Sequence, residues 1–499
     1  MAVAGVDIGT TGAKCTVFDD SGNVRSYAYS EYDLISSLPG CYELDLNAVR
    51  DAVKKVISEA AHKYKSNDIQ AICVTSFGET VVMLDSKGQI LCNSMIYMDK
   101  RGAEQCGRIE AHFTKEKISE VTGLLPHAMY TAAKIMWLEE NRHDIIERTQ
   151  KIFFVADYIL YTLGAGHYTD YSLASRSMAF DVARKSWWAD MLDYIGISGD
   201  LLPQPVPTGS VVGIINPSIA LELGLPKDIK LIIGGHDQVV NALGAGVLET
   251  GKAMNGIGTV DCITPAFYME QVNTALAKYN FPCVPYINDN MYVTYAFSMS
   301  GGSLLKWFRD NLARDVAAAA KGLGENAYAM LDRQMPSEPT DILVLPHFAG
   351  TGTPYMDVFS KGAIVGLTFS VSREQIYRAI LEGEAYEMKF NIECLEDSGV
   401  VINELRTVGG GSKSDIWMQI RADIMNKQVV CLSVEEAGTL GSAMLAGVAT
   451  GHFGSLEEAR EALVKVKKVF YPNPANMEAY TENYRKYKKL YKNVKDVIS

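Results

Sequence analysis

The sequence predicts an α/β protein, and three observations support this fold class. Short apolar runs that end at glycine turns alternate with amphipathic segments of helical period, as strands and helices do in α/β folds. The chain has 499 residues, 48% of them hydrophobic, so it can form the cores of roughly two to four domains. Two similar turns, at residues 9–12 and 256–259, lie about half a chain apart and suggest a duplicated architecture around one nucleotide.

The composition excludes several classes of partner. The 47 basic and 59 acidic residues give a net charge of −12, which disfavours binding to nucleic acid. Nine scattered cysteines without a CxxC pair indicate reduced thiols in the cytoplasm rather than disulfides or zinc. No apolar run has transmembrane length, and the N-terminus predicts a strand rather than a signal peptide. We therefore expect a cytoplasmic protein that acts on a small molecule, without a nucleic-acid or membrane partner.

The first predicted element is a strand, a turn and a second strand over residues 4–19. Asp7 ends the first strand and Lys14 begins the second. The turn between them, Gly9-Thr10-Thr11-Gly12, can point successive N–H groups at phosphate oxygens, and Lys14 adds a cation. Asp7 is an oxygen ligand suited to hydrated Mg²⁺. The turn lacks the GxxxxGK[ST] pattern, so it is not a Walker A loop.

The following segment continues the alternation of strand and helix. Residues 19–23 predict a hairpin turn, residues 46–63 an amphipathic helix, and residues 69–75 and 81–84 two strands.

Two carboxylates, Glu79 and Asp99, stand where strands are expected to end, and Arg101 follows closely. Carboxylates and an arginine at one sheet edge can hydrogen-bond the hydroxyls of a sugar. The spacing equally allows surface ion pairs, and residue pattern alone leaves both interpretations open.

The central stretch of the chain, residues 231–259, carries a second acidic site. An apolar strand over residues 231–233 stops at Gly234-Gly235 and brings Asp237 to the strand's carboxyl end, where α/β enzymes bind ligands. The turn Gly256-Ile257-Gly258-Thr259 then offers N–H groups and a hydroxyl to an anion. Alternatively, Asp237 is a helix N-cap and the glycines are ordinary turns.

The second half of the chain repeats the α/β alternation. Ser300-Gly301-Gly302 begins a helix, residues 342–345 predict a strand, and Ser372 with Gln375 forms a capping box. Residues 405–415 predict a strand, the turn Gly409-Gly410-Gly411, and a helix start. A single glycine-rich turn is a weak nucleotide signal, but three such turns in one chain together indicate a nucleotide site.

Two longer patterns resemble the signatures of the FGGY family of carbohydrate kinases, within the actin/Hsp70/sugar-kinase superfamily. They are Met129-x-Thr131-x-x-Lys134-Ile135-x-Trp137-Leu138-x-Glu140-Asn141 and Gly362-Ala363-Ile364-Val365-Gly366-Leu367 followed by Gln375-Ile376-x-x-Ala379-Ile380-Leu381-Glu382. The resemblance runs nearly end to end. It implies two ribonuclease-H-like domains, with an interdomain cleft that closes during catalysis. We therefore expect an N-terminal domain over residues 1–245 and a C-terminal domain over residues 246–499.

The resemblance also implies an ATP- and Mg²⁺-dependent phosphotransferase with roles for particular residues. Asp237 matches the general base, and Asp7 matches an acid linked to Mg²⁺ through water. The remaining matches are Thr10, Thr11 and Lys14 beside the terminal phosphates; Gly258 and Thr259 in the second phosphate motif; Gly302 near the phosphates; Gly409, Gly410, Gly411 and Ser414 in the adenosine motif; and Gly78, Glu79, Asp99 and Gln238 around the acceptor.

The acceptor positions are compared with two branches of the family. Xylulose kinases usually have Met-His where this chain has Gly78-Glu79, although their Asp-x-Arg is present as Asp99-Lys100-Arg101. Glycerol kinases have Arg-Glu-Thr where this chain has Gly78-Glu79-Thr80, and an aromatic residue at Met129, but they share Asp237-Gln238.

The pair His236-Asp237 is similar to that of deoxysugar ketose kinases. We therefore expect a xylulokinase-like enzyme that phosphorylates a ketopentose or related ketose, with a polyol such as glycerol or erythritol as the alternative. An ATP-binding regulator without kinase activity is the less favoured alternative, and a homodimer is the assembly considered.

Overall fold

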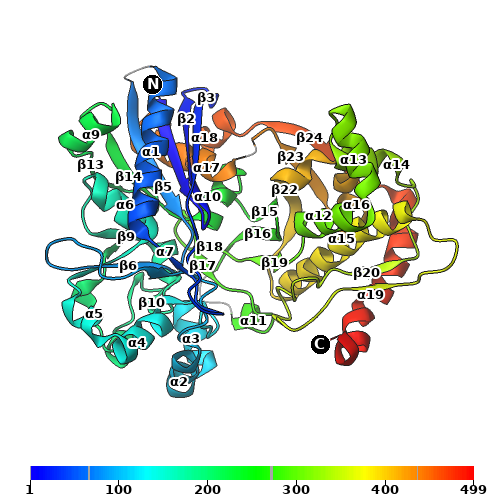
Figure 1. Ribbon diagram of the computed structural model, residues 1–499, viewed down its shortest axis with the longest axis horizontal. Helices are drawn as coiled ribbons and strands as arrows, with labels where there is room; N and C mark the ends of the chain where they lie inside the picture. The colour runs from blue at the N-terminus through cyan, green and yellow to red at the C-terminus, as the bar shows by residue number, and fades with distance from the viewer. Residues whose placement is uncertain (1, 66–67, 270–273, 435, 499) are drawn as a thin grey trace.

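The computed structural model describes residues 2–65, 68–269, 274–434 and 436–498. It has two α/β lobes side by side, each built around its own sheet (Figure 1). The predicted fold class is confirmed. No helix in these described ranges has the length and apolar character needed to cross a membrane.

The first lobe is built on a six-stranded sheet whose central strands are fully buried. Because β1, β5 and β14 run parallel, their carboxyl ends lie at one edge of the sheet. Asp7 lies near the end of β1, and Glu79 and Asp237 follow β5 and β14, so the topology brings the predicted acids to one edge. The strand order is β13 (Val211–Ile214), β14 (Lys230–His236), β5 (Ile69–Ser76), β1 (Ala2–Ile8), β2 (Gly12–Asp19) and β3 (Val24–Glu31).

Helices cover this sheet, and further helices and short strands continue the lobe below it in Figure 1. Helix α1 (Leu46–Tyr64) begins at the N-cap Asp45 and buries a stripe that includes Val49, Val53 and Val56. The other elements of the lobe are β4 (Glu43–Leu44), β6 (Val81–Leu84), β7 (Ser94–Met95), α2 (Ala103–Phe113), α3 (Lys115–Thr122), α4 (Thr131–Asn141), α5 (His143–Arg148), β8 (Lys151–Phe154), α6 (Val155–Leu163), β9 (Tyr168–Asp170), α7 (Tyr171–Ser175), β10 (Phe180–Asp181), β11 (Ser186–Trp187), α8 (Ala189–Ile195), β12 (Gln204–Val206), α9 (Pro217–Leu223) and α10 (Asp237–Gly244).

The second lobe is built on a sheet of similar design. Strands β15 and β16 form an antiparallel hairpin, and β15 pairs in parallel with β22, so the 256–259 and 409–411 turns lie at the same end of the sheet. The order is β17 (Val284–Pro285), β18 (Met291–Val293), β16 (Asp261–Tyr268), β15 (Gly251–Ile257), β22 (Ile402–Val408), β23 (Gln428–Leu432) and β24 (Val466–Phe470), with β19 (Ala296–Ser298) paired to β16.

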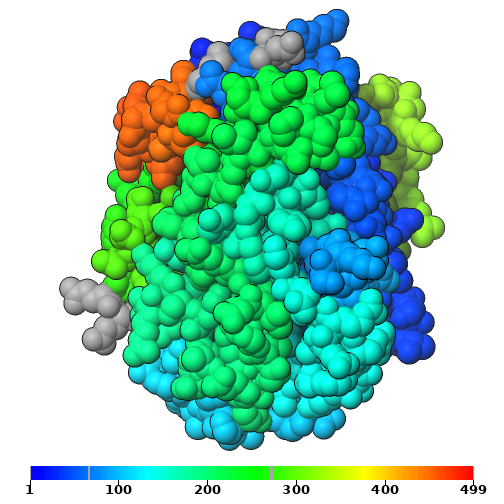
Figure 2. Space-filling view, turned by 90° about the vertical axis from the view of Figure 1, so that its left-hand side faces the viewer, coloured from blue at the N-terminus to red at the C-terminus, as the bar shows by residue number. Residues whose placement is uncertain are grey.

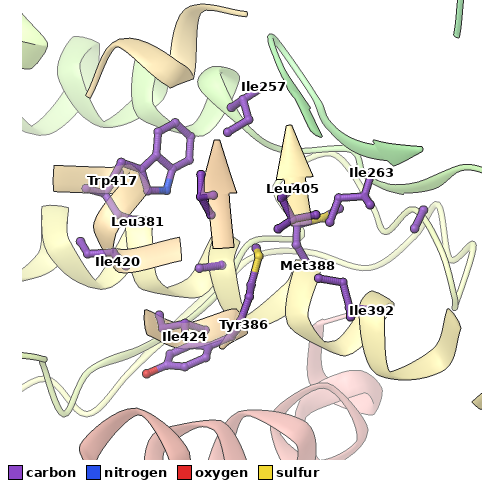
Figure 3. Packing of buried hydrophobic residues seen from close by; sticks show 14 of the residues in the cluster. Ile257, Ile263, Leu381, Tyr386, Met388, Ile392, Leu405, Trp417, Ile420 and Ile424 are labelled. Atoms are coloured by element: carbon purple, nitrogen blue, oxygen red, sulfur yellow. The ribbon is translucent and has the colours of Figure 1, made fainter. Parts of the chain in front are cut away.

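Helix α15 (Arg373–Asp397) forms the centre of the second core. Ser372 and Gln375 make the predicted capping box at its start. Its residues Leu381, Met388 and Ile392 pack with Leu405 of β22 and with Trp417 of α16 (Asp415–Met425), as Figure 3 shows. The other elements are α11 (Thr274–Ala277), α12 (Gly302–Leu312), α13 (Arg314–Leu323), α14 (Ala327–Gln334), β20 (Leu343–Leu345), β21 (Ala363–Val365), α17 (Ala437–Ala449), α18 (Leu456–Leu463) and α19 (Met477–Ile498).

The lobes are joined by two helices, α10 and α17, that approach each other very closely. A Cβ on Gly244 would lie 1.8 Å from the carbonyl oxygen of Ala437, and one on Gly5 of β1 would lie 2.3 Å from that of Thr439. Only glycine allows this approach. Helix α17 therefore packs against β1 and β5 of the first sheet, and Figure 2 shows orange chain, the colour of α17 and α18, beside the first lobe.

The expected domain boundary at residues 245/246 falls between α10 and β15. It remains a proposal.

Candidate active site

The first phosphate turn joins β1 to β2. Asp7 and Lys14 are register partners across this hairpin, and the Nζ of Lys14 lies 3.2 Å from Oδ2 of Asp7. The N–H of Gly9 donates to the carbonyl of Gly12 at 2.9 Å, and the hydroxyl of Tyr32 donates to the carbonyl of Gly9. Thr10 is half-buried and Thr11 is exposed. The turn is therefore held in shape while its tip stays accessible.

Around this turn, two carboxylates share a single ammonium group. The Nζ of Lys14 also contacts the carboxylate of Glu436, at the start of α17. Burial raises the pKa of Asp7, although Lys14 opposes the shift. Burial lowers the pKa of Lys14, but Asp7 and Glu436 outweigh it and raise that pKa above its ordinary value. Two carboxylates that share one ammonium group would be stabilised by a further cation.

The residues at this turn fit a hydrated magnesium ion. No cluster of three or more His, Cys, Asp or Glu in the part of the chain that the structure describes could enclose a metal. Mg²⁺ does not need such a cluster, because it keeps several waters and binds through one or two carboxylates and substrate phosphates. The buried carboxylate of Asp7 supplies one such ligand. A Cβ on Gly438 would lie 2.8 Å from its Oδ2, so glycine preserves the space there.

Asp237 is the first residue of α10 and lies directly after β14. The N-cap is His236, so the alternative that Asp237 itself is the N-cap is not what the structure shows. Gly235 has φ +95°, and a Cβ there would lie 2.5 Å from Oδ2 of Asp170. The N–H of His236 donates to the hydroxyl of Ser172 at 2.9 Å. This glycine turn, fixed by α7, directs Asp237 to the sheet edge.

The environment of Asp237 makes its carboxylate unusually basic. Burial raises its pKa to about 8, and the nearby charges of Asp7 and Glu79 add to the effect. The backbone N–H of Gln238 and the charge of Arg176 oppose the shift. A carboxylate with a pKa near neutrality can both accept and hold a proton under physiological conditions.

The segment after β5 places Glu79 beside Asp237. Glu79 has φ +63°, a conformation that costs energy in a non-glycine residue, and the hydroxyl of Thr131 donates to its carbonyl at 3.0 Å. The Nε of Arg176 donates to Oε1 of Glu79 at 2.6 Å. A Cβ on Gly78 would lie 2.9 Å from both Arg176 Cγ and His236 Cδ2, so glycine gives these two side chains their room.

Asp99 is placed differently from Glu79. Its fully buried carboxylate accepts from Nε and Nη2 of Arg101, at 3.0 and 2.6 Å, and from the N–H of Tyr42 at 2.8 Å. Arg101 Nη2 also donates to Glu43 at 2.6 Å. The ion-pair interpretation therefore describes the contacts of Asp99, and a direct contact with a sugar stays a prediction.

Two residues that the sequence analysis did not select, Arg176 and Tyr295, lie at the acceptor site. The guanidinium of Arg176 lies between the rings of Tyr130 and Tyr295, 5.1 and 5.6 Å from their centroids. One signal was present, because Arg176 is the only Lys or Arg between Lys151 and Arg184 in a stretch of apolar and small residues.

The second phosphate turn lies at the tip of the β15–β16 hairpin. The N–H of Gly258 donates to Val260 at 3.0 Å, and the N–H of Gly302 donates to the carbonyl of Gly258 at 2.8 Å. The N–H of Ser303 donates to the carbonyl of Thr259 at 3.2 Å. Gly302 is thus hydrogen-bonded to this turn, and its expected contact with the phosphates stays a prediction.

A buried network below this turn fixes both strands of the hairpin. Arg421 donates to Asp261 Oδ2 at 2.6 Å and to Asn255 Oδ1 at 2.8 Å, and Asn255 donates to Asp261 at 2.6 Å.

The predicted adenosine turn packs directly on the second phosphate turn. Gly409 has φ +89°, and Cβ atoms on Gly409 and Gly411 would lie 2.6 and 2.3 Å from atoms of Ile257. A Cβ on Gly410 would meet nothing within 4 Å. Ser414 caps α16 by accepting from the N–H of Trp417 at 3.1 Å, and it donates to Asp332 at 2.7 Å. Gly410 therefore lines open space, whereas Ser414 has helix-capping contacts.

The second lobe also reaches Asp237. The hydroxyl of Tyr295 lies 3.1 Å from Nδ1 of His236, whose Nε2 lies 3.4 Å from Oδ1 of Asp237. Burial, and then the charge of Arg176, lower the pKa of His236 well below its usual range, so its ring is neutral. Asp237, the predicted base, and the second lobe thus meet at His236 and Tyr295.

The protein has two lobes, each with glycine turns at the edge of its sheet, and acids lie between the lobes. This arrangement defines a phosphotransferase with the actin-like ATPase fold. The models of the FGGY family of carbohydrate kinases match residues 2–244 with the N-terminal domain and residues 264–450 with the C-terminal domain. The chain belongs to this family and is an ATP-dependent carbohydrate kinase.

Named relatives cover nearly the whole chain. A xylulose kinase of Bacillus subtilis (strain 168) is 28% identical over 500 residues, which cover 99% of this chain and 97% of the relative. A glycerol kinase of Thermococcus gammatolerans is 32% identical over 490 residues, with coverages of 94% and 93%. The crystal structure of ligand-bound xylulose kinase from Lactobacillus acidophilus has a TM-score of 0.90 at 24% identity, and covers 100% of this chain and 99% of that one. This last likeness establishes the fold.

Proposed function

We propose that the protein transfers the terminal phosphoryl group of ATP to a hydroxyl of a ketopentose or related ketose, with Asp237 as the general base. The observation that carries this proposal is the carboxylate of Asp237, which is 23% exposed and has a pKa raised to about 8 beside Asp7 and Glu79. The same residue argues against a regulator without kinase activity, because such a protein does not need a basic carboxylate at this edge.

The base is needed because a sugar hydroxyl is a poor nucleophile at neutral pH. Asp237 takes the hydroxyl proton as the oxygen attacks phosphorus, and its raised pKa makes the transfer more favourable than to an ordinary carboxylate. Glu79 and Gln238 hold neighbouring hydroxyls, and Gly78 leaves room for the side chains of Arg176 and His236. This positioning turns an encounter of two molecules into a reaction within one complex.

The phosphates of ATP would bind between the two hairpin turns. The amides of residues 9–12 and 256–259 donate to phosphate oxygens, Lys14 contributes a positive charge, and Gly410 lines the space for the adenosine. Asp7 would hold Mg²⁺ through water, and the ion would neutralise charge on the phosphates as it does in phosphoryl transfer generally. Closure of the lobes would exclude water, which otherwise competes as acceptor.

A polyol is the second candidate acceptor. The glycerol kinases among the relatives reach 31–32% identity, compared with 28% for the xylulose kinase of Bacillus subtilis. The glutamate–threonine pair at Glu79-Thr80 and the Asp237-Gln238 pair also agree with glycerol kinases. Against glycerol, position 78 is glycine, and the volume beside it is filled by Arg176 and His236.

A screen for ADP release, coupled to a spectroscopic readout, tests the proposal. The screen covers ketoses, aldoses and polyols at saturating ATP and Mg²⁺, with Asp237→Asn as the matched variant. The proposal expects the highest kcat/KM with a ketose and little release by the variant. Highest activity with glycerol or another polyol would select the second candidate, and no activity with any acceptor would reject both.

The cellular setting is also proposed. All nine cysteines are free of disulfides in the structure, which agrees with the reducing cytoplasm. The homodimer remains a prediction that analytical ultracentrifugation would test.

A further inference from the structure

The buried ion pair between Arg176 and Glu79 is the feature of the acceptor site that the proposed reaction does not yet explain. Both side chains are nearly inaccessible, at 6% and 4% exposure. Arg176 follows α7 and Glu79 follows β5, so the pair joins two segments that are 97 residues apart. The flat guanidinium is also enclosed by the rings of Tyr130 and Tyr295. Arg176 is therefore held by an ion pair and by two aromatic rings.

Stability alone does not account for this arrangement. Neutral side chains of similar volume usually replace a buried ion pair without loss of stability. Glu79 also has a positive φ, which is unfavourable for its residue type, and Nη1 of Arg176 is buried without a hydrogen-bond partner. Strain and an unsatisfied donor are typical of places where geometry serves function.

We propose that Arg176 is a positioning residue for the acceptor: it fixes the carboxylate of Glu79 toward the sugar, and the Tyr295 ring of the second lobe holds Arg176 in place. The inference rests on the proposed function, in which Glu79 binds the acceptor. In this proposal Arg176 acts through Glu79, whose carboxylate is bound by both Nε and Nη2 of the guanidinium.

Tyr295 connects this pair to the phosphate side of the cleft. It lies between β18 and β19, in the second lobe, and β19 leads within a few residues to Gly301 and Gly302. Gly302 is bonded to Gly258 of the second phosphate turn. Tyr295 thus stands directly before β19, the strand that leads to Gly301 and Gly302, and this connection would align the two substrates for transfer.

A double-mutant cycle on Arg176→Met and Glu79→Gln tests the proposal, with the sugar KM as the main readout. We expect Glu79→Gln to raise the KM for the best sugar on the order of 10-fold, because it loses a charge-assisted hydrogen bond. Arg176→Met should be at least as damaging, because it leaves Glu79 buried and unpaired. The double variant should be no worse than Glu79→Gln, since Arg176 has no effect without its partner.

Readouts on the nucleotide side separate positioning from misfolding. The KM for ATP, and any ATP hydrolysis without sugar, should stay within twofold in all three variants. Arg176→Lys should recover only part of the sugar affinity, because an ammonium group cannot reproduce the planar fork of the guanidinium. The matched control is Arg378→Met with Glu382→Gln, another buried pair, on α15 of the second lobe. It should leave the sugar KM unchanged.

The outcomes distinguish this inference from the proposed function. If the losses from Arg176→Met and Glu79→Gln multiply in the double variant, Arg176 acts independently and the inference is wrong. If Glu79→Gln leaves every sugar KM unchanged, Glu79 does not bind the acceptor, and the inference falls while the role of Asp237 stands. Loss of sugar use in the control pair would show a general effect of removing buried charges and also reject the inference.

The role of the second lobe is tested at Tyr295. Tyr295→Phe keeps the ring over Arg176 and removes only the hydroxyl that lies 3.1 Å from Nδ1 of His236, so it is the comparison variant for the ring. Tyr295→Leu removes the ring and should raise the sugar KM several-fold, with the KM for ATP unchanged. Equal sugar KM values in the two variants would contradict the contribution of the second lobe.

Discussion

The carboxyl edge of the first sheet and the glycine turns of the second lobe, residues 256–259 and 409–411, differ in how their charges are arranged. At the edge of the first sheet, the three carboxylates of Asp7, Glu79 and Asp237 lie close together with few cations near them. Burial raises the pKa of Asp7 and of Asp237. At the nucleotide turns, the chain exposes glycine backbone, and the charged groups below it, Arg421 and Asp261, are paired and fully buried. The comparison indicates that a reactive site keeps an excess of one charge, whereas a binding turn is supported by charges that are fully paired.

The largest expected effect concerns the buried network of Arg421, Asp261 and Asn255 in the second lobe, which is the frame of its glycine turns. Arg421→Met would leave Asp261 buried without its cation, at a cost of about 3–5 kcal/mol in the free energy of unfolding. A urea titration of the variant measures this loss. A loss below about 1 kcal/mol would show that the frame does not depend on the network, and would weaken the contrast between the lobes.

The next effect concerns the one cation of the first phosphate turn. Lys14→Met should lower kcat on the order of 10²-fold, because charge on the transferred phosphoryl group loses a stabilising partner. It also leaves Asp7 and Glu436 without their shared ammonium group. Steady-state kinetics with saturating sugar measure the change. A fall confined to the KM for ATP, with kcat unchanged, would limit Lys14 to ground-state binding.

A smaller effect separates two neighbouring glycines of the adenosine turn. Gly410→Leu places its side chain in open space, so it should fold normally and raise the KM for ATP about 10-fold by occupying the adenosine space. Gly411→Leu would collide with Ile257 and should instead lower the melting temperature. Unchanged ATP affinity in folded Gly410→Leu would place the adenosine elsewhere.

One expected effect has the opposite sign, because removing the carboxylate of Asp237 should increase stability. Because the folded-state pKa of Asp237 is raised from 3.8 to about 8, its ionisation destabilises the fold as the pH rises between these values. Asp237→Asn should therefore melt at a higher temperature than the natural protein at pH 8, with a smaller difference at pH 5. Differential scanning calorimetry at the two pH values measures this. A difference independent of pH would contradict the raised pKa.

The success of sequence reasoning differed between local and distant features. Asp7 and Lys14 face each other because a short hairpin fixes their register, and the strand–glycine–acid pattern located Asp237 because parallel strands share a carboxyl edge. Both depend on neighbours in the chain or on a general rule of α/β sheets.

Features made by distant segments were not predictable in this way. The pairing of Arg176 with Glu79, and the position of Tyr295, depend on how lobes and loops pack. The docking of α17 on the first sheet depends on the missing side chains of Gly5 and Gly244, whose effect is visible only once both surfaces are in place. Asp99 resembled Glu79 in its spacing, but the nearby Arg101 occupies its carboxylate.

The most direct test of the account is the pH dependence of kcat/KM for the best sugar in the natural protein and in Asp237→Asn. If Asp237 is the base, kcat/KM of the natural protein rises with pH, reaches half of its maximum near pH 8 and levels off above it, as the carboxylate loses its proton. The variant should bind ATP normally, have kcat lowered by at least ~10²-fold, and lack that rise. Near-normal turnover in the variant, or the same rise with pH, would contradict the account.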